Sequence, residues 1–283
     1  MFYKVLSLNF VFLYFVFLFF VLSLMLGCKL PQTFNPLTAS RLRSVELEHL
    51  GNTALERGDN PAAEKYLSDA LRLNRRDVEL RRSYAESLWR QGKQREALAQ
   101  LQYAQKHGGQ NGATLNISLA EKLLVLDDID GAYKQADEAV RFAPQDARGW
   151  ALRGKAILAL VQKQLNTSDE KNKIADNESV NQPDNKMTDK IRELIVKSRN
   201  DYYRAISIDP ENRVILAELA NVQLLAGQPE HSLVTLQNLQ EQYPPNSIPP
   251  EILRCKARAY IALKKYDEAN RCLAAANGTT ELK

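Results

Sequence analysis

The sequence has few of the residues that bind metals or act as nucleophiles. Its 283 residues include three cysteines and three histidines. The cysteines are Cys28, Cys255 and Cys272, and no two of them have metal-ligand spacing. His49, His107 and His231 are scattered, without cysteines or a carboxylate pattern around them. The sequence therefore predicts no metal site.

Catalytic motifs are also missing. The chain has no glycine-rich phosphate loop, no G-x-S-x-G, no H-E-x-x-H and no paired C-x-x-C. Its carboxylates are spread in the way that is typical of solvated helix surfaces, and no nucleophile is paired with a base. We therefore expect a protein that is not an enzyme and that has no cofactor.

A concentrated block of positive charge is absent as well. Residues 1–28 contain one charged side chain, Lys4, and the rest of the chain carries 37 basic and 34 acidic residues. A protein that neutralises many phosphates needs a basic patch or stripe. The near balance of charge therefore argues against nucleic acid as a partner.

The N-terminus, in contrast, is strongly apolar. Residues 10–26 read FVFLYFVFLFFVLSLML, after the basic Lys4. A positive start, an apolar stretch and then small residues are typical of an export signal. The stretch Leu24-Met25-Leu26-Gly27-Cys28 resembles a bacterial lipoprotein box, although Met25 stands where leucine is usual. In such a box the cysteine receives diacylglycerol and becomes the new N-terminus, so Cys28 is the predicted lipidation site.

Two other interpretations of this segment stay open. Counted from Val5, it reaches the ~20 apolar residues of an uncleaved membrane anchor, and free secretion is the third outcome. The first two both predict an exported protein held at a membrane. It would be an outer-membrane lipoprotein facing the periplasm or, alternatively, a protein with a single-span anchor. Residues 29–43 include KLPQTFNPLTAS, with two prolines, and are predicted to form a flexible tether.

A repeat of about 34 residues occupies the rest of the chain. Small residues recur at Gly51, Ala85, Ala120, Gly154, Ala220 and Ala257. A second series follows, at Ala63, Ala97, Ala132, Ser198, Ser232 and Ala269. The gap between the two series is 12 residues in every unit except the fourth, where it is 44. Six units therefore share one internal geometry, and one of them carries 32 extra residues.

Each unit has the pattern of two helices joined by a short turn. Two segments of roughly 12–14 residues show apolar side chains at helical spacing. The turn residues between them are Gly58, Gly92, Asp127, Gly227 and Lys264. Glycine supplies the left-handed conformation that ends a helix, and the small residues allow the two helices to approach closely.

These patterns resemble the tetratricopeptide repeat family. Unit four, for example, carries Trp150, Gly154, Ile157, Tyr202, Ala205 and Pro210 at the family's first aromatic, glycine, second aromatic, bulky, alanine and proline positions. Arg153 and Lys256 depart from the pattern, because each replaces its leucine. The resemblance implies an all-α fold, a right-handed solenoid of about six antiparallel helix pairs in which each unit contacts only its neighbours. The units are 44–77, 78–112, 113–146, 147–212, 213–249 and 250–283.

The extra residues of unit four differ in composition. Residues 165–187 read LNTSDEKNKIADNESVNQPDNKM, with many charges, one proline and no aromatic residue. Such a segment buries too little apolar surface to offset the entropy of ordering it. We expect a passive, disordered loop, with a partner-binding loop as the alternative.

The resemblance also implies a binding surface. In this family the first helix of each pair lines a concave groove that holds peptides or helices of partner proteins. Carried over onto this sequence, the lining residues are Asn52, Glu56, Glu79, Arg82, Glu86, Trp89, Arg90, Ile117, Glu121, Leu124, Arg148, Lys155, Asn221, Leu224, Arg254 and Arg258. Trp89 is the best anchor candidate. Glu79–Arg82 and Glu86–Arg90 equally have the spacing of ion pairs within one helix.

Together these patterns predict a non-catalytic scaffold that binds other proteins of the bacterial cell envelope. The alternative is a non-catalytic accessory subunit of an envelope enzyme complex, for example in cell-wall or polysaccharide synthesis. The sequence does not separate the two.

The last unit gives two further expectations. Cys255 and Cys272 lie at matching heights of an antiparallel pair, which is compatible with a disulfide or with two half-buried thiols. The final helix has no polar cap after it, so an apolar strip including Tyr266 and Leu273, with Tyr260 and Leu263, is expected to be exposed. Such a strip would mediate self-association or partner binding.

Overall fold

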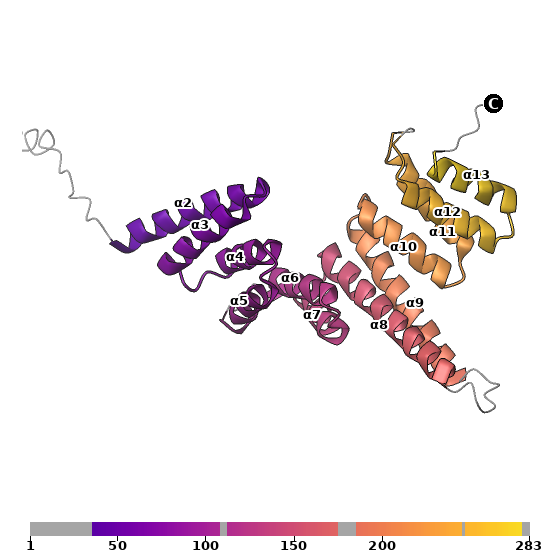
Figure 1. Ribbon diagram of the computed structural model, residues 1–283, viewed down its shortest axis with the longest axis horizontal. Coiled ribbons are helices and arrows are strands. Elements are labelled where there is room, and N and C mark those ends of the chain that lie inside the picture. Colours follow the sequence, from indigo (N-terminus) through magenta and orange to yellow (C-terminus); the bar gives the residue numbers. More distant parts are fainter. Residues whose placement is uncertain (1–35, 108–111, 175–184, 245–246, 279–283) are drawn as a thin grey trace, which may run out of the picture.

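The computed structural model describes residues 36–107, 112–174, 185–244 and 247–278. In these ranges the chain forms twelve helices in six antiparallel pairs, which follow an arc with the first and last pairs at its ends (Figure 1). The helices are α2 (Pro36–Glu56), α3 (Asn60–Leu73), α4 (Val78–Arg90), α5 (Gln94–His107), α6 (Gly112–Val125), α7 (Ile129–Phe142), α8 (Ala147–Ile174), α9 (Asn185–Ile208), α10 (Arg213–Leu225), α11 (Pro229–Glu241), α12 (Pro250–Ala262) and α13 (Tyr266–Ala276). The expected all-α solenoid of six helix pairs is confirmed.

Small residues set the distance between the two helices of a unit. A Cβ atom on Gly51 would lie 2.5 Å from Cγ of Leu67, and one on Gly154 would lie 2.9 Å from Cε2 of Tyr202. The hydroxyl of Ser198 donates to the carbonyl of Gly154 at 2.8 Å. Larger residues at these glycines would therefore push the paired helices apart, as the repeat pattern indicated.

Left-handed residues end the first helix of five units. The φ angle is +77° at Gly58, +78° at Gly92 and +71° at Gly227. It is +60° at both Asp127 and Lys264. These are the five turn residues that the sequence predicted, and the last two adopt a conformation that is unfavourable for a residue with a Cβ atom.

Neighbouring units stack through apolar side chains. The second helix of each of the first five units carries one fully buried residue, four positions after its small residue, and each is at most 1% exposed: Leu67, Leu101, Ala136, Tyr202 and Leu236. Residues from the first helix of the following unit complete these clusters, for example Leu80 beside Leu67 and Leu115 beside Leu101. Each unit therefore depends on the next one to cover its core.

The first helices form the inner side of the arc. α2 lies against α4, α6 against α8, and α10 against α12. No two second helices in the described ranges approach one another to the same extent. The first helices consequently line the concave face, and the second helices lie on the outside.

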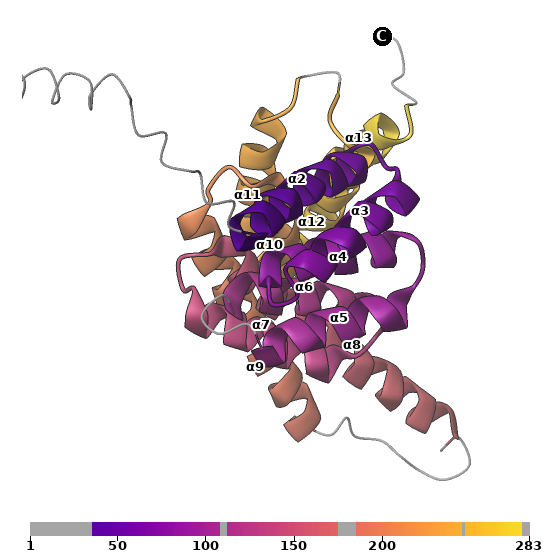
Figure 2. The same cartoon turned by 90° about the vertical axis from the view of Figure 1, so that its left-hand side faces the viewer.

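Unit four differs from the sequence-based expectation at both ends of its insertion. α8 continues to Ile174 and α9 starts at Asn185, so residues 165–174 and 185–187 are helical instead of disordered. The two helices project from the other units as a long hairpin (Figures 1 and 2). Val161 is 4% exposed, and Leu158 and Ile195 pack on the core, so the apolar seam continues towards the insertion. Extending a paired helix costs less than starting one, which composition alone did not show. The rest of the predicted loop, 175–184, lies outside the described residues.

The boundary with the predicted tether also differs. α2 starts at Pro36, so residues 36–43 are helical and not part of a flexible tether. Proline fits the first turn of a helix because its φ is already helical and its missing N–H would be unpaired there. Residues 1–35, with the apolar segment and Cys28, lie outside the described residues. Over the ranges that are described, no helix is long and apolar enough to cross a membrane.

Of the four residues in the apolar strip that the sequence predicted for the last unit, two are exposed. Tyr266 is 59% and Leu273 is 37% exposed, whereas Tyr260 and Leu263 are half-buried. Cys255 and Cys272 are free thiols, and the Sγ of Cys255 donates to the side-chain oxygen of Asn221 at 3.3 Å. Of the two interpretations of these cysteines, the structure therefore shows unbridged thiols.

Candidate functional site

The residues predicted to line the groove all lie on first helices. They are distributed over α2, α4, α6, α8, α10 and α12. Ile117 is the one that the structure removes from the surface, because only 3% of it is exposed. Burial of this apolar side chain stabilises the fold, and its position in the repeat pattern did not show that.

Glu86 and Arg90 together link three units across the inner face. The Glu86 carboxylate accepts hydrogen bonds from Nε of Arg90 at 2.8 Å and from Nζ of Lys122, on α6, at 2.7 Å. Arg90 also donates to the carbonyl of Leu55, on α2, at 2.9 Å. Burial acts to raise the pKa of Glu86, but the hydrogen bonds from Lys122 and Arg90 outweigh it and the pKa is lowered. Glu86 and Arg90 are therefore committed to contacts between units.

Trp89 is also partly engaged. Its side chain is half-buried and packs on the core of unit two, and Nζ of Lys122 lies 5.2 Å from the centre of its ring. A cation over the face of tryptophan is attracted by the ring electrons. The predicted anchor therefore presents only part of its surface to a partner.

The α2–α4 end of the inner face is acidic. Glu48 is half-buried, and burial raises its pKa, with further contributions from the charges of Asp77 and Glu79. Only Glu79 has a cation close by, since Arg82 donates to it at 2.8 Å. Negative charge is therefore concentrated where the first two units meet.

The α10–α12 end of the same face presents hydrogen-bond donors. Nη1 of Arg258 approaches the side-chain oxygen of Asn221 at 3.4 Å, and the same oxygen accepts from Cys255. Within the described residues, no hydrogen bond uses the Asn221 amide nitrogen, which leaves it available as a donor. Arg254 is exposed and pairs loosely with Glu251 at 3.4 Å. This end therefore suits acceptors such as carboxylates or main-chain carbonyls.

The middle of the face carries both signs of charge. Arg148 donates to Asp146 at 2.7 Å, and its pKa is raised first by that hydrogen bond, with a smaller contribution from the charge of Glu121. Glu121 and Lys155 are exposed. Asn52 is half-buried on α2.

Exposed apolar side chains lie between these polar groups, and sequence reasoning missed them. The five are Val45 (62% exposed), Val125 (68%), Val214 (72%), Leu225 (51%) and Ile261 (48%). Each stands three, four or seven residues from a predicted groove residue of its own helix, and so shares its face. The sequence alone shows this spacing, and it could have predicted that these residues lie on the groove face.

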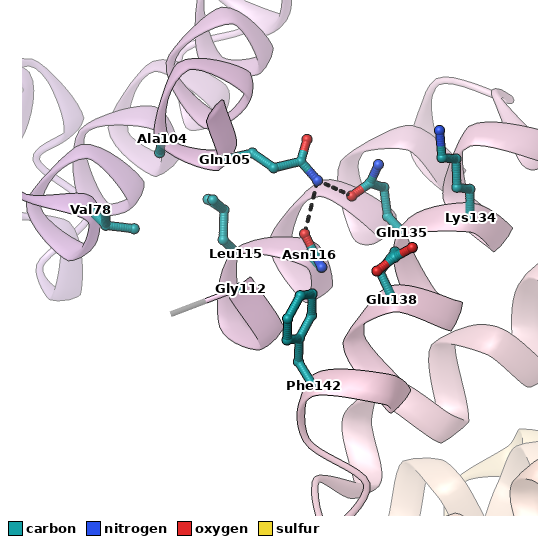
Figure 3. A pocket seen from close by; sticks show the side chains of 10 residues that line it. All are labelled: Val78, Ala104, Gln105, Gly112, Leu115, Asn116, Lys134, Gln135, Glu138 and Phe142. Carbon is teal, nitrogen blue, oxygen red and sulfur yellow. Dashed lines mark hydrogen bonds between the residues drawn. The ribbon is translucent and has the colours of Figure 1, made fainter. Parts of the chain in front are cut away.

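A separate cavity of about 270 Å³ lies among α4, α5, α6 and α7 (Figure 3). Gln105 donates to the side-chain oxygens of Asn116 at 3.0 Å and of Gln135 at 2.6 Å, and the ring of Phe142 forms part of the wall. Asn116 stands four residues before the small residue of its unit. The corresponding residues in the other units are all larger: Leu47, Arg81, Trp150, Leu216 and Leu253. The short side chain of Asn116 therefore contributes to a space between units two and three, whose lining combines the amides of Gln105, Asn116 and Gln135 with Lys134 and Glu138.

A metal-binding constellation is not found among the residues that the structure describes, where no group of histidine, cysteine and carboxylate side chains is arranged to hold an ion. The features assembled on the inner face are hydrogen-bond donors, acceptors and apolar side chains. These groups can bind a polypeptide segment.

Comparisons with known proteins support the fold. No family model and no curated protein matches the sequence. Among solved structures, PilF of Pseudomonas aeruginosa matches with a TM-score of 0.63 and 12% identity, over 83% of this chain and 90% of that one. TTC0263 of Thermus thermophilus, a tetratricopeptide repeat protein, matches with a TM-score of 0.51 and 17% identity, over 72% and 92%.

A third solved structure is YrrB, described as a tetratricopeptide repeat protein with an unusual peptide-binding site. It matches with a TM-score of 0.54 and 14% identity, over 76% of this chain and 92% of that one. At these identities the likeness concerns the fold alone. The chain therefore has the tetratricopeptide-type solenoid fold, as the residue pattern indicated.

Proposed function

We propose that this chain is a non-catalytic scaffold whose concave face binds a segment of another protein. The observation that carries the proposal is the exposed apolar set Val45, Val125, Val214, Leu225 and Ile261 on the inner face. These side chains are 48–72% exposed, and they belong to helices from four of the six units. Apolar side chains gathered on one face are typical of contact sites. YrrB, a peptide-binding protein of similar fold, supports the same function.

The charges on this face favour one direction for the bound segment. The α2–α4 end carries Glu48 and Glu79, and the α10–α12 end carries Arg254 and Arg258. A segment with basic residues at one end and acidic residues at the other would meet opposite charge along its length. Such complementarity contributes more to orientation and association rate than to affinity.

The binding face is tested by photo-crosslinking in cells. A photoreactive residue replaces Val125 or Leu225 on the inner face, or Val234 on α11 as the control. Val234 is matched to them because it is apolar and 63% exposed but lies on a second helix. We expect a protein adduct from the first two positions and none from Val234. Equal yields from all three would contradict a groove-bound partner. A captured enzyme of envelope synthesis would make the chain an accessory subunit.

The proposed location is the cell envelope, with the scaffold exported and attached through lipid on Cys28. Its support is the sequence pattern of Leu24 to Cys28 after an apolar export signal. Cys28→Ser should abolish incorporation of labelled fatty acid, whereas Cys272→Ser, which removes a half-buried thiol, should leave it unchanged. Label in the Cys28→Ser protein, or none in the wild type, would exclude lipidation.

A further inference from the structure

The outer end of unit six lacks the cover that every other unit has. Leu273 on α13 stands at the repeat position of Leu67, Leu101, Ala136, Tyr202 and Leu236. Those five residues are at most 1% exposed, whereas Leu273 is 37% exposed. Tyr266, one turn from Ala269 on the same helix, is 59% exposed. The difference arises because, among the described residues, no helix follows α13 to cover it.

The internal junctions show what covers this position. In three of them, the first helix of the following unit presents two large side chains four residues apart to the preceding second helix. The pairs are Leu80 and Tyr84, Leu115 and Leu119, and Ile215 and Leu219. Residues four apart lie on one face of a helix. The uncovered face of unit six is therefore the same kind of surface. It should accept a helix that presents two large apolar side chains four residues apart.

The first helix of a second copy of this chain fits the surface poorly. In α2 the two corresponding positions hold Glu46 and Leu50. The side chain of Glu46 is 59% exposed and forms a 2.7 Å ion pair with Arg43. Burying this ion pair against Leu273 would remove charged groups from water, and that desolvation is costly. Head-to-tail stacking of copies is therefore disfavoured.

We propose that the end face formed by α12 and α13, centred on Leu273, binds an amphipathic helix of a partner protein. The partner helix carries two large apolar residues four positions apart and docks as the first helix of a seventh unit would. This second contact is independent of the concave groove. The scaffold would therefore hold two partner segments at once, one along its inner face and one at its C-terminal end.

A peptide derived from α10 serves as the probe. Residues 213–225, RVILAELANVQLL, with lysines added at both ends and a fluorescent label, are titrated with the full chain in detergent micelles while anisotropy is recorded. We expect saturable binding that Leu273→Glu weakens by at least about tenfold, equivalent to ~1.4 kcal/mol. Val234→Glu, at a more exposed position on α11, and Leu225→Glu in the groove should leave the affinity unchanged.

Three results would overturn the proposal. The first is the absence of saturable binding to the wild type. The second is equal affinity for the Leu273→Glu protein, or for a control peptide in which serine replaces the residues copied from Ile215 and Leu219. The third is a dimer, seen by light scattering, that both Leu273→Glu and Leu50→Glu dissociate, because the occupant would then be a second copy. Circular dichroism of each variant checks that it remains folded.

Discussion

Arg153 shows how a single departure from the repeat pattern is accommodated. It stands where the pattern has leucine, and its guanidinium donates twice to Asp201, at 2.9 and 2.7 Å, and once to Asp137, at 2.8 Å. Its Cζ also lies 4.7 Å from the centre of the Trp150 ring. The hydrogen bonds to Asp201 raise the pKa of Arg153 above its usual value in spite of burial. The pair therefore stays charged inside the junction of α7, α8 and α9.

The cost of breaking this ion pair can be predicted. Arg153→Leu restores the family residue but leaves Asp201, 4% exposed, without its cation. Removing one partner of a buried pair costs ~3 kcal/mol, whereas replacing both with apolar residues is close to neutral. We expect urea unfolding to show that loss for Arg153→Leu and recovery of most of it in the double variant with Asp201→Leu.

Arg141 provides the control for that experiment. It pairs with Asp137 at 2.8 Å, but its side chain is 68% exposed. Exposed ion pairs contribute ~0–1 kcal/mol. Arg141→Leu should therefore change the unfolding free energy by less than Arg153→Leu does. A double variant no more stable than Arg153→Leu alone would exclude a specific role for the pair.

A substitution at a left-handed turn residue, in contrast, is expected to stabilise the protein. Lys264 has φ +60°, where an L side chain costs ~1–2 kcal/mol and glycine does not. Lys264→Gly should therefore raise the midpoint of thermal unfolding, and Gly92→Ala, at φ +78°, should lower it. Lys265→Gly is the matched control, because Lys265 has φ −92° and gains nothing from glycine. A fall in the midpoint for Lys264→Gly would contradict this account.

At the scale of elements, the α8–α9 hairpin is where the structure revises the sequence most. α8 has 28 residues and α9 has 24, compared with 11–14 in most other helices. Amides in 160–174 should therefore exchange with solvent more slowly than those of an unstructured chain, with protection decreasing towards Ile174 because helix ends fray. Mass-spectrometric hydrogen exchange measures this. Exchange at the unstructured rate throughout 165–174 would restore the loop interpretation.

Most of the fold could be predicted from the sequence because repetition shows the same physical requirement six times. The small residues, the turn residues and the helix pairs each recur at fixed spacing. The α8–α9 hairpin occurs once, so its structure had to be predicted from composition alone. Composition does not show that a polar helix can be stabilised by packing against a neighbouring helix. The Arg153–Asp201 pair was hidden for a similar reason, since the insertion places its two residues 48 positions apart.

The candidate site could be predicted less completely. The pattern identified the helices that line the groove, but it did not show which of their charges are already paired. Glu86 and Arg90 bond across units, while Val125, Val214 and Leu225 remain exposed. Which side chain is covered depends on the stacking of neighbours, and no single unit contains that information.

At the scale of the whole molecule, carboxylates that join units make stability depend on pH. The pKa of Glu64 is lowered first by the hydrogen bond from Lys93, and that of Glu86 is lowered because its hydrogen bonds from Lys122 and Arg90 outweigh burial. A carboxylate whose folded pKa is depressed stabilises the fold above its unfolded pKa, and this contribution is lost as pH falls through the folded value. We therefore expect the unfolding free energy to fall as pH drops below the ordinary value of 4.5.

Glu48 should behave in the opposite way, because burial raises its pKa. Its ionised form costs stability near neutral pH, and protonation relieves that cost. Glu48→Gln should thus raise the midpoint of thermal unfolding at pH 7 and have little effect at pH 4, whereas Glu86→Gln should lower it at pH 7. Equal effects of both variants at the two pH values would show that these carboxylates are not coupled to folding.

The long separation in sequence between Arg153 and Asp201 also affects when their contact can form during synthesis of the chain. In a chain synthesised from its N-terminus at about 5–20 residues per second, Arg81 waits roughly 1–4 s for its bonding partner Gln100, 19 residues later. Arg153 waits roughly 2–10 s for Asp201, which is 48 residues later. Until then Arg153 is paired with Asp137 of α7 alone, and Ile157 on the same helix is uncovered. The nascent chain is therefore most exposed to chaperones and proteases while the hairpin is being made.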